Sequence, residues 1–204
     1  MIMKLIILTK STFFVEEDKI LNTLFNEGMD NLHLYKPMSV ALYSERLLSL
    51  LSEDYCKKIT IHDHYHLKTK FNLAGIHLDN ATKRIPIGYN GRIGRTCNNI
   101  TTLKEFRQKS DYVFLKNIFD CTEFKNEKSN FCLKQLEKAS QMKLIDKHVY
   151  ALGGMNIEHA KIAKMLGFGG IVICGDLWQY FDIHKQADFK KIITHFEKLR
   201  RAIN

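Results

Sequence analysis

Proline is almost absent from this sequence, with two residues in 204, and no stretch is enriched in proline, glycine and serine. Flexible linkers between domains usually have such a composition, so no linker is evident within the chain. Hydrophobic residues make up 45% of the sequence and charged residues 26%, as in ordinary globular domains with a buried core. We therefore predict a single domain over residues 1–204, a length that suits one fold.

Long hydrophobic runs are also missing. The apolar start of the chain, residues 1–8, is too short for a signal peptide and has no small-residue cleavage site. No segment approaches the roughly 20 apolar residues that a membrane-spanning helix needs. The five cysteines form no Cys-x-x-Cys pair, and their odd number fits a reducing compartment better than a disulfide framework. These absences predict a soluble, cytoplasmic protein without a membrane partner.

Acidic residues are the minority charge, because 22 Asp and Glu stand against 31 Lys and Arg, for a net charge of +9. Such an excess favours anionic partners. Nucleic-acid binding usually needs a stripe of basic residues. Here the basic residues are spread along predicted helices, as at Lys134, Lys138 and Lys143. We expect no nucleic-acid partner, whereas a small phosphorylated ligand would need only a few of these cations.

Short apolar strands alternate with helices along the chain. The strands are predicted at residues 3–9, 31–35, 58–63, 75–78, 92–97, 111–119, 148–152 and 170–174. Helical spacing of apolar residues follows every strand except the fourth, after which residues 80–89 show no convincing helix. This alternation predicts parallel strands covered by helices. Eight units in a chain of this length favour an α/β fold of the (β/α)8 TIM barrel type, and a doubly wound open sheet is the alternative.

The loops after the last two predicted strands are rich in glycine. Gly153-Gly154 precedes a helix capped by Asn156, and Gly175-Asp176 follows the final strand. Glycine lets backbone N–H groups approach an anion closely, and a helix N-terminus adds a favourable dipole. Barrels of this type commonly bind phosphate with these two loops. We predict that Gly153, Gly154, Gly175 and Asp176 bind a phosphate group; the alternative is that the paired glycines only form a tight turn.

Histidines gather at the ends of the third and fourth predicted strands, at His62, His64 and His77, with Asp63 among them. Strand alternation places His62 and His64 on one face and makes His77 a candidate neighbour. A structural zinc site would want four ligands, and no cysteine lies at a suitable spacing. Asp63 offers oxygen ligands to Mg²⁺. Three roles are therefore open for this segment: a zinc site, a magnesium site through Asp63, or the lining of a polar pocket.

For three further side chains, both a functional and a structural role are considered. Lys116 lies in an otherwise apolar strand, so it either points to the barrel mouth toward an anion or extends outward past the helices. Cys121 and Cys174 have no evident partner for nucleophilic chemistry, and we expect them in the core.

The segments around these strand ends resemble, in order and spacing, those of the thiamine phosphate synthase and TenI family over nearly the whole chain. The matching segments are Leu32–Pro37, Ile61–His64, Ala74–Leu78, Asp111–Leu115, Ala151–Gly154 and Gly169–Val172. The resemblance implies a barrel enzyme of thiamine biosynthesis. Synthases of this family transfer a hydroxymethylpyrimidine group from its pyrophosphate to thiazole phosphate with the help of Mg²⁺, and release pyrophosphate. TenI-type relatives isomerise a thiazole carboxylate phosphate without a metal.

The resemblance also implies roles for single residues. Gly153, Gly154 and Gly175 would hold the thiazole phosphate. Asp63 matches one magnesium carboxylate of the synthases, and the second falls at or near Thr82, for which Asp79 is a possible substitute.

The pyrophosphate contacts implied by the resemblance differ from the family pattern. The arginine and lysine of the synthases fall at Tyr35 and Pro37, which leaves Lys36 as the cation nearby. Thr96 replaces a serine and keeps its hydroxyl, and Lys125 takes the place of a loop lysine. Lys116 adds a cation to the expected substrate site.

Three functions follow from these residues. The first is a transferase of the synthase class with Mg²⁺ as cofactor and small phosphorylated thiazole and pyrimidine substrates. The second is a TenI-like tautomerase, in which His62, His64 or His77 moves the proton. The third is a non-catalytic protein that binds thiazole phosphate. The sequence leaves open whether the chain forms a homo-oligomer.

Overall fold

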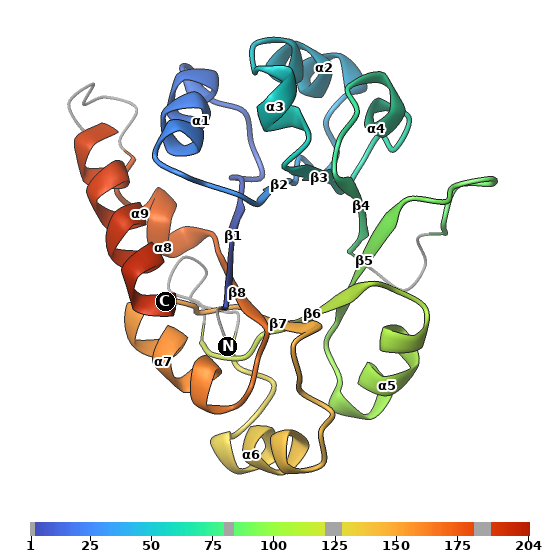
Figure 1. Ribbon diagram of the computed structural model, residues 1–204, viewed down its shortest axis with the longest axis vertical. Coiled ribbons are helices and arrows are strands. Elements are labelled where there is room, and N and C mark those ends of the chain that lie inside the picture. Colours follow the sequence, from blue (N-terminus) through green and yellow to red (C-terminus); the bar gives the residue numbers. More distant parts are fainter. Residues whose placement is uncertain (1–2, 80–83, 121–127, 182–188) are drawn as a thin grey trace.

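Eight parallel strands form a closed barrel in the computed structural model, which describes residues 3–79, 84–120, 128–181 and 189–204. Figure 1 looks down the ring of strands, with helices around its outside. The strands are β1 Lys4–Leu8, β2 Leu32–Leu34, β3 Ile59–Ile61, β4 Gly75–Leu78, β5 Arg92–Cys97, β6 Tyr112–Lys116, β7 Val149–Leu152 and β8 Gly170–Ile173. The predicted (β/α)8 TIM barrel is confirmed.

Closure of the barrel depends on β1, which pairs with a strand on each side. Ile7 pairs with Leu32 of β2, and Lys4 pairs with Gly170 of β8, both in parallel. A doubly wound sheet would leave two strands at open edges, so this pairing excludes the alternative fold.

The helices are α1 Glu17–Asn26, α2 Ala41–Ser49, α3 Glu53–Cys56, α4 Leu67–Lys70, α5 Ile100–Gln108, α6 Leu133–Gln141, α7 Ile157–Met165, α8 Gly175–Trp178 and α9 Phe189–Ile203. Between β4 and β5, residues 84–91 contain no helix and extend away from the barrel (Figure 1). This agrees with the lack of a helical pattern in the sequence after the fourth strand, for the part of this connection that the structure describes. No helix among the described residues is long and apolar enough to cross a membrane.

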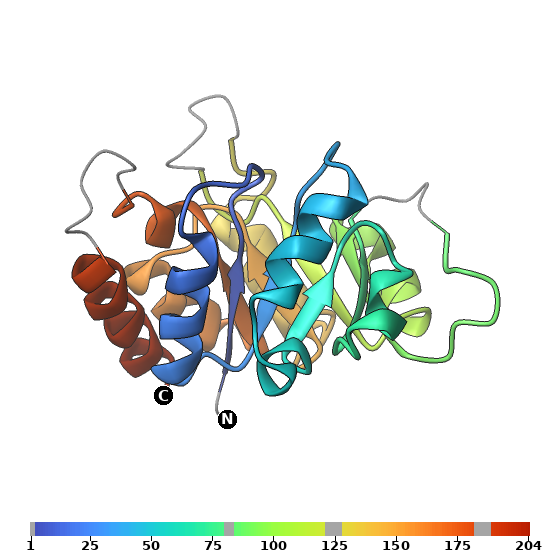
Figure 2. The ribbon, with the colours of Figure 1, turned by 90° about the horizontal axis from the view of Figure 1, so that it is seen from above.

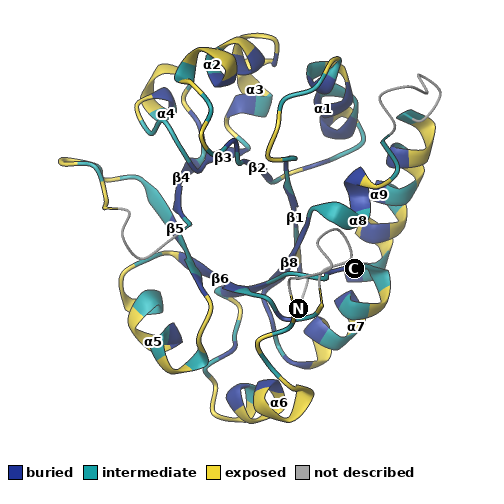
Figure 3. Ribbon diagram, turned by 180° about the vertical axis from the view of Figure 1, so that it is seen from behind, coloured by how far each residue is buried: buried dark blue, intermediate teal, exposed yellow. Residues whose placement is uncertain are grey.

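The main core lies between the strands and the surrounding helices. On α9, Ile192, Phe196, Leu199 and Ile203 recur every three or four residues and are all buried, so the helix presents one apolar face to the barrel. Figure 3 shows the same division, with buried residues toward the strands and exposed ones outside.

A second, smaller cluster fills the barrel interior. Its buried members are Ile6, Tyr112, Phe114, Tyr150 and Val172, from β1, β6, β7 and β8. The barrel is therefore closed by packed side chains, as is usual for this fold. A ligand site must lie above them, at the carboxyl ends of the strands, which face away from the N-terminus in Figure 2.

Candidate active site

A cavity of about 470 Å³ opens at the carboxyl ends of the strands, and all eight strands or the loops after them contribute to its wall. The size is typical of a site for a small ligand. The wall is formed by Leu8, Thr9, Lys10, Ser11, Tyr35, His62, Asp79, Thr96, Phe114, Lys116, Asn117, Leu152, Gly153, Gly154, Met155, Val172, Cys174, Gly175 and Asp176. Most of the residues predicted for the site are among them.

The loops after β7 and β8 meet in this cavity. Gly153 and Gly154 have φ angles of +102° and +62°, and a Cβ atom on Gly154 would lie 2.3 Å from the carbonyl oxygen of Asp120. Glycine is therefore needed here so that the loop can pack against the backbone after β6. The side chain of Asn156 then accepts a hydrogen bond from the His159 N–H at 2.8 Å and caps α7. Gly175 lines the same cavity at the start of α8.

Asp176 also lines the cavity, but its carboxylate is engaged in the protein. His195 Nε2 on α9 lies 2.6 Å from one carboxylate oxygen, and Gln179 Nε2 donates to the other at 3.2 Å. The contact with His195 joins α8 to α9. The three glycines are therefore better placed than the Asp176 carboxylate to receive an anion.

Two lysines bring positive charge to the cavity. Lys116, at the end of β6, lines it, so its side chain points to the barrel mouth and not outward past the helices. Lys10, after β1, lies in the same wall. Their positions suit an anionic ligand.

Lys36 is not part of this cavity. Its side chain is 1% exposed, and its Nζ lies 2.6 Å from Glu17 Oε1 and 2.9 Å from the carbonyl oxygen of Thr12. The ammonium group also lies 4.6 Å from the ring centre of Phe13. Burial lowers the pKa of Lys36 and raises the pKa of Glu17, while the opposite charge of each partner acts against these shifts. The structure thus places the predicted pyrophosphate ligand Lys36 in a buried ion pair.

The carboxylates expected for Mg²⁺ lie in different places. Asp79, directly after β4, lines the cavity, whereas Asp63 is half-buried and is not among its lining residues. Magnesium prefers oxygen ligands and is usually bound through one or two carboxylates together with substrate phosphates. Of the two carboxylates, Asp79 is the one in the cavity wall, where a ligand phosphate could share an ion with it.

Only one of the two histidines at the end of β3 faces the cavity. His62 lines it, whereas His64 has a φ angle of +53° and places its Nε2 2.8 Å from the carbonyl oxygen of Ser39. The prediction that both share one face was wrong, because β3 ends at Ile61 and strand alternation does not continue through His64.

His77 lies directly behind the cavity wall, as the predicted neighbour of His62. The two rings stack with centres 4.4 Å apart, and His77 Nε2 lies 2.9 Å from Thr96 Oγ1, which lines the cavity. His77 therefore reaches the cavity through the Thr96 hydroxyl.

His33 is a further buried histidine beside His62 and His77, and it was not among the predicted site residues. Its Nδ1 lies 2.9 Å from His62 Nε2, and His33, His62 and His77 together could offer nitrogen atoms to a metal ion. Burial holds the pKa of His33 well below its usual range, and the charges of His62 and Arg92 lower it further. Strand alternation could have identified it, since Leu32 and Leu34 on either side point to the opposite face.

Some predicted residues have other outcomes. Lys125, Cys121 and Thr82 lie outside the residues that the structure describes. Cys174 is half-buried, and it packs against the main core and also lines the cavity, so the expectation of a core position is met only in part.

Comparison with known proteins agrees with this geometry. A family model described as thiamine monophosphate synthase matches residues 42–177. The crystal structure of thiamine phosphate pyrophosphorylase from Bacteroides thetaiotaomicron superimposes with a TM-score of 0.88 at 42% identity, covering 98% of this chain and 97% of that one.

A more distant relative shows how far the fold extends. Thiamine phosphate pyrophosphorylase from Pyrococcus furiosus superimposes with a TM-score of 0.74 at 18% identity, over 98% of this chain and 95% of that one, which shows the common fold. No curated protein sequence matched. Because the family model spans most of the chain and the Bacteroides enzyme matches almost its full length, the chain belongs to the thiamine monophosphate synthase family.

Proposed function

We propose that this protein is a transferase of thiamine biosynthesis that joins a hydroxymethylpyrimidine group to thiazole phosphate and releases pyrophosphate. The observation that carries the proposal is a single cavity whose wall holds three glycines from the loops after β7 and β8, Lys116 and Lys10 from the adjoining strands β6 and β1 or the loop that follows, and Asp79 after β4. Family membership supports the same activity.

The glycine side of the cavity suits the thiazole phosphate. Backbone N–H groups at Gly153, Gly154 and Gly175 can approach phosphoryl oxygens without interference from a side chain. The N-terminus of α7 lies just beyond Gly154, and its dipole favours an anion there.

The cationic residues suit the pyrophosphate of the second substrate. Lys116 and Lys10 would neutralise part of the charge that develops as pyrophosphate leaves. Tyr35 and Thr96 would position the pyrimidine substrate. Lys36 is left out, because it is already paired with Glu17.

Mg²⁺ would be held by Asp79 together with the pyrophosphate oxygens, and it would stabilise the charge of the leaving group. Asp63, the carboxylate favoured by the family resemblance, is the alternative ligand. Substitution of each carboxylate in turn can show which of them binds Mg²⁺, since only Asp79 lines the cavity.

A synthase assay tests the proposal. Pyrophosphate release from hydroxymethylpyrimidine pyrophosphate should require both thiazole phosphate and Mg²⁺. Asp79→Asn should lower kcat/KM by about 10²–10³-fold, the size expected for loss of a group that stabilises a leaving anion. Asp63→Asn is the matched control. A stronger effect of Asp63→Asn would identify Asp63 as the magnesium ligand instead of Asp79. Absence of turnover in the wild-type protein would contradict the proposal.

One observation favours a second candidate, a metal-independent thiazole tautomerase. His77 Nε2 lies 2.9 Å from the Thr96 hydroxyl in the cavity wall, which brings an imidazole that could move a proton close to a bound ligand. In this case, isomerisation of thiazole carboxylate phosphate should proceed without Mg²⁺ and fall in His77→Ala and His62→Ala. His64→Ala serves as control, since His64 contacts Ser39 instead. Binding of thiazole phosphate with neither activity would indicate the non-catalytic function.

A further inference from the structure

The end of β7 and the loop after it contain successive peptide groups whose carbonyl oxygens are held from one side. The carbonyl oxygen of Leu152 accepts a hydrogen bond from the Ile118 N–H at 3.2 Å, and that of Gly153 accepts one from the Phe119 N–H, also at 3.2 Å. Both donors belong to the backbone that follows β6. The loop after β7 is therefore anchored on its β6 side.

The next carbonyl oxygen, that of Gly154, is held by a side chain. His159, in the first turn of α7, places its Nδ1 2.6 Å from this oxygen. A carbonyl oxygen can only accept, so Nδ1 carries the proton and donates it. The imidazole also stacks on the ring of Phe119, with ring centres 3.8 Å apart and 15° between the planes. The side chain of His159 is thus fixed on the same side as the donors after β6.

The N–H groups of these peptides point the other way. A trans peptide group is planar, and its C=O and N–H point in opposite directions. The contacts described above therefore turn the N–H groups of Gly153, Gly154 and Met155 away from the β6 side. All three residues line the cavity, and within the described part of the chain these N–H groups donate to no backbone carbonyl. Successive N–H groups of this kind form a concavity that binds anions.

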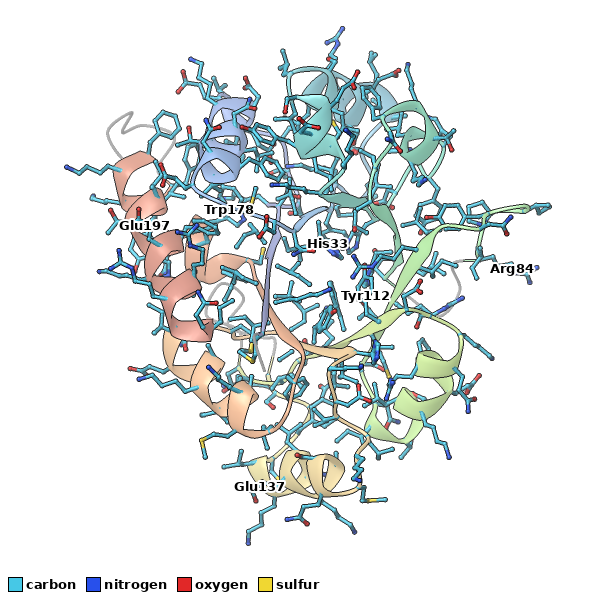
Figure 4. All side chains as sticks on the ribbon, in the orientation of Figure 1. His33, Arg84, Tyr112, Glu137, Trp178 and Glu197 are labelled. Atoms are coloured by element: carbon cyan, nitrogen blue, oxygen red, sulfur yellow. The ribbon has the colours of Figure 1, made fainter. Side chains whose placement is uncertain are left out.

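An anion must bind at the level of the loops, because the barrel interior beneath them is filled. Figure 4 shows His33 and Tyr112 inside the ring of strands, and both side chains are buried. Gly175 lines the cavity from the loop after β8, the strand that pairs with β7. The loops after β7 and β8 therefore offer the place where a ligand phosphate can meet these N–H groups.

Of the three N–H groups, that of Met155 is the one whose direction depends on a side chain. The peptides that carry the N–H groups of Gly153 and Gly154 are held by backbone donors. The N–H of Met155 belongs to the peptide group that His159 holds. Glycine has an unusually wide range of backbone conformations, so the peptide after Gly154 can rotate when this contact is lost.

We propose that His159 is a positioning residue of the phosphate site. It holds the peptide group between Gly154 and Met155 so that the Met155 N–H donates to a phosphoryl oxygen of the ligand. His159 acts from behind the loop, since it is not among the residues that line the cavity. This inference rests on the proposed phosphate site, but it does not require synthase turnover.

Two substitutions separate the hydrogen bond of His159 from its stacking. His159→Phe keeps a ring over Phe119 and removes the donor. His159→Asn removes the ring but keeps an N–H donor, because the amide nitrogen of asparagine is bonded to Cγ as Nδ1 is in histidine. In calorimetry with thiazole phosphate, the Kd of His159→Phe should rise about tenfold, as expected for loss of a hydrogen bond to a charged group. The Kd of His159→Asn should stay close to the wild-type value, whereas a role in packing alone predicts the reverse order.

His148 provides a matched control. Its Nδ1 lies 3.2 Å from the carbonyl oxygen of Asp111, but His148 precedes β7 and so lies at the end of the strand opposite to the cavity. His148→Phe removes the same kind of contact and should leave the Kd for thiazole phosphate unchanged. Circular dichroism checks that each variant is folded.

The amide signal of Met155 in ¹⁵N NMR spectra reports the contact directly. Thiazole phosphate should shift this signal strongly in the wild-type protein and in His159→Asn, but only weakly in His159→Phe. The ring of His159 should also show its proton on Nδ1 in the wild-type protein without ligand.

The possible results distinguish this inference from the proposed function. An unchanged Kd in His159→Phe, or a His159→Asn variant that binds as weakly as His159→Phe, would overturn the inference. Binding of thiazole phosphate to the wild-type protein without a shift of the Met155 signal would overturn it as well. If the wild-type protein binds no thiazole phosphate, both the phosphate site and the role of His159 are refuted. Absence of synthase turnover alone would refute the transferase, while the expected differences in Kd would still support the role of His159.

Discussion

Lys36 and Glu17 form an ion pair that is almost completely withdrawn from solvent. Their side chains are 1% and 2% exposed, and Nζ and Oε1 lie 2.6 Å apart. The pair joins the loop after β2 to the first turn of α1. The family resemblance favoured Lys36 as a ligand of pyrophosphate, whereas the structure places it in this ion pair. Experiments on the pair can distinguish a role in substrate binding from a role in stability.

Removing one partner of this pair should be costly. Glu17→Ala leaves the Lys36 ammonium buried with no carboxylate, and we expect a loss of about 3–5 kcal/mol in the free energy of unfolding. The double variant Glu17→Met/Lys36→Met removes both charges and should recover most of that loss. Urea denaturation measures both values. If the double variant also keeps its affinity for pyrophosphate, Lys36 is structural, whereas a selective loss of that affinity would return Lys36 to the substrate site.

His33 should make the stability of the protein depend on pH. Its pKa lies well below the ordinary 6.5 in the folded protein, so below pH 6.5 the unfolded chain binds a proton that the folded chain does not. The free energy of unfolding should then decrease as the pH falls from 6.5 toward the folded-state pKa, by at most about 1.4 kcal/mol per pH unit for this residue. Urea denaturation at pH 7, 6 and 5 gives the slope.

The His33→Gln variant isolates this contribution, because glutamine retains hydrogen-bonding groups but does not titrate. Its free energy of unfolding should fall less steeply with decreasing pH than that of the wild-type protein. His66→Gln removes an exposed histidine and should keep the wild-type slope. Equal slopes in all three proteins would contradict the assignment of the pH dependence to His33.

The fold was predictable because apolar periodicity is a strong local signal. The bounds of β4 and β5 agree with the prediction, although β5 has poor strand-forming residues. The sixth strand was predicted to reach residue 119 but ends at Lys116, since Asn117 takes a φ angle of +61° and the chain turns toward Gly153. The four-residue helix α8 has too few residues to show a helical period.

The site was predictable only in part, because sequence spacing gives the face of a strand but not where that strand ends. The positions of Gly153 and Gly154 follow from the end of β7 at Leu152, which was placed correctly. Lys116 lines the cavity as predicted, although β6 ends three residues earlier than expected. His64 was misplaced by carrying alternation past Ile61. The burial of Lys36 depends on Glu17, which lies nineteen positions earlier, and no local pattern indicates that contact.

Trp178 should stabilise the closure of the barrel through a single hydrogen bond. It is the only tryptophan, it is 1% exposed, and its Nε1–H donates to the carbonyl oxygen of Leu8 at the end of β1 over 2.7 Å. Trp178→Phe keeps an aromatic ring but leaves that buried carbonyl without this donor, so we expect a loss of about 1–3 kcal/mol in the free energy of unfolding. Urea denaturation followed by circular dichroism is the measurement, and a loss near zero would show that the bond contributes nothing.

Gly154 should be needed for ligand binding more than for the turn itself, and Gly88 provides a matched control. Both have positive φ angles, +62° and +76°, so an alanine at either position is strained. A Cβ on Gly154 would also lie 2.3 Å from the Asp120 carbonyl oxygen, whereas nothing lies within 4 Å at Gly88. Gly154→Ala must therefore displace the loop after β7, and the Kd for thiazole phosphate measured by calorimetry should rise at least tenfold, about 1.4 kcal/mol. Gly88→Ala should lose stability but keep its Kd. Equal affinity in both variants would remove Gly154 from the phosphate site, since the displaced loop would then have no contact with the ligand.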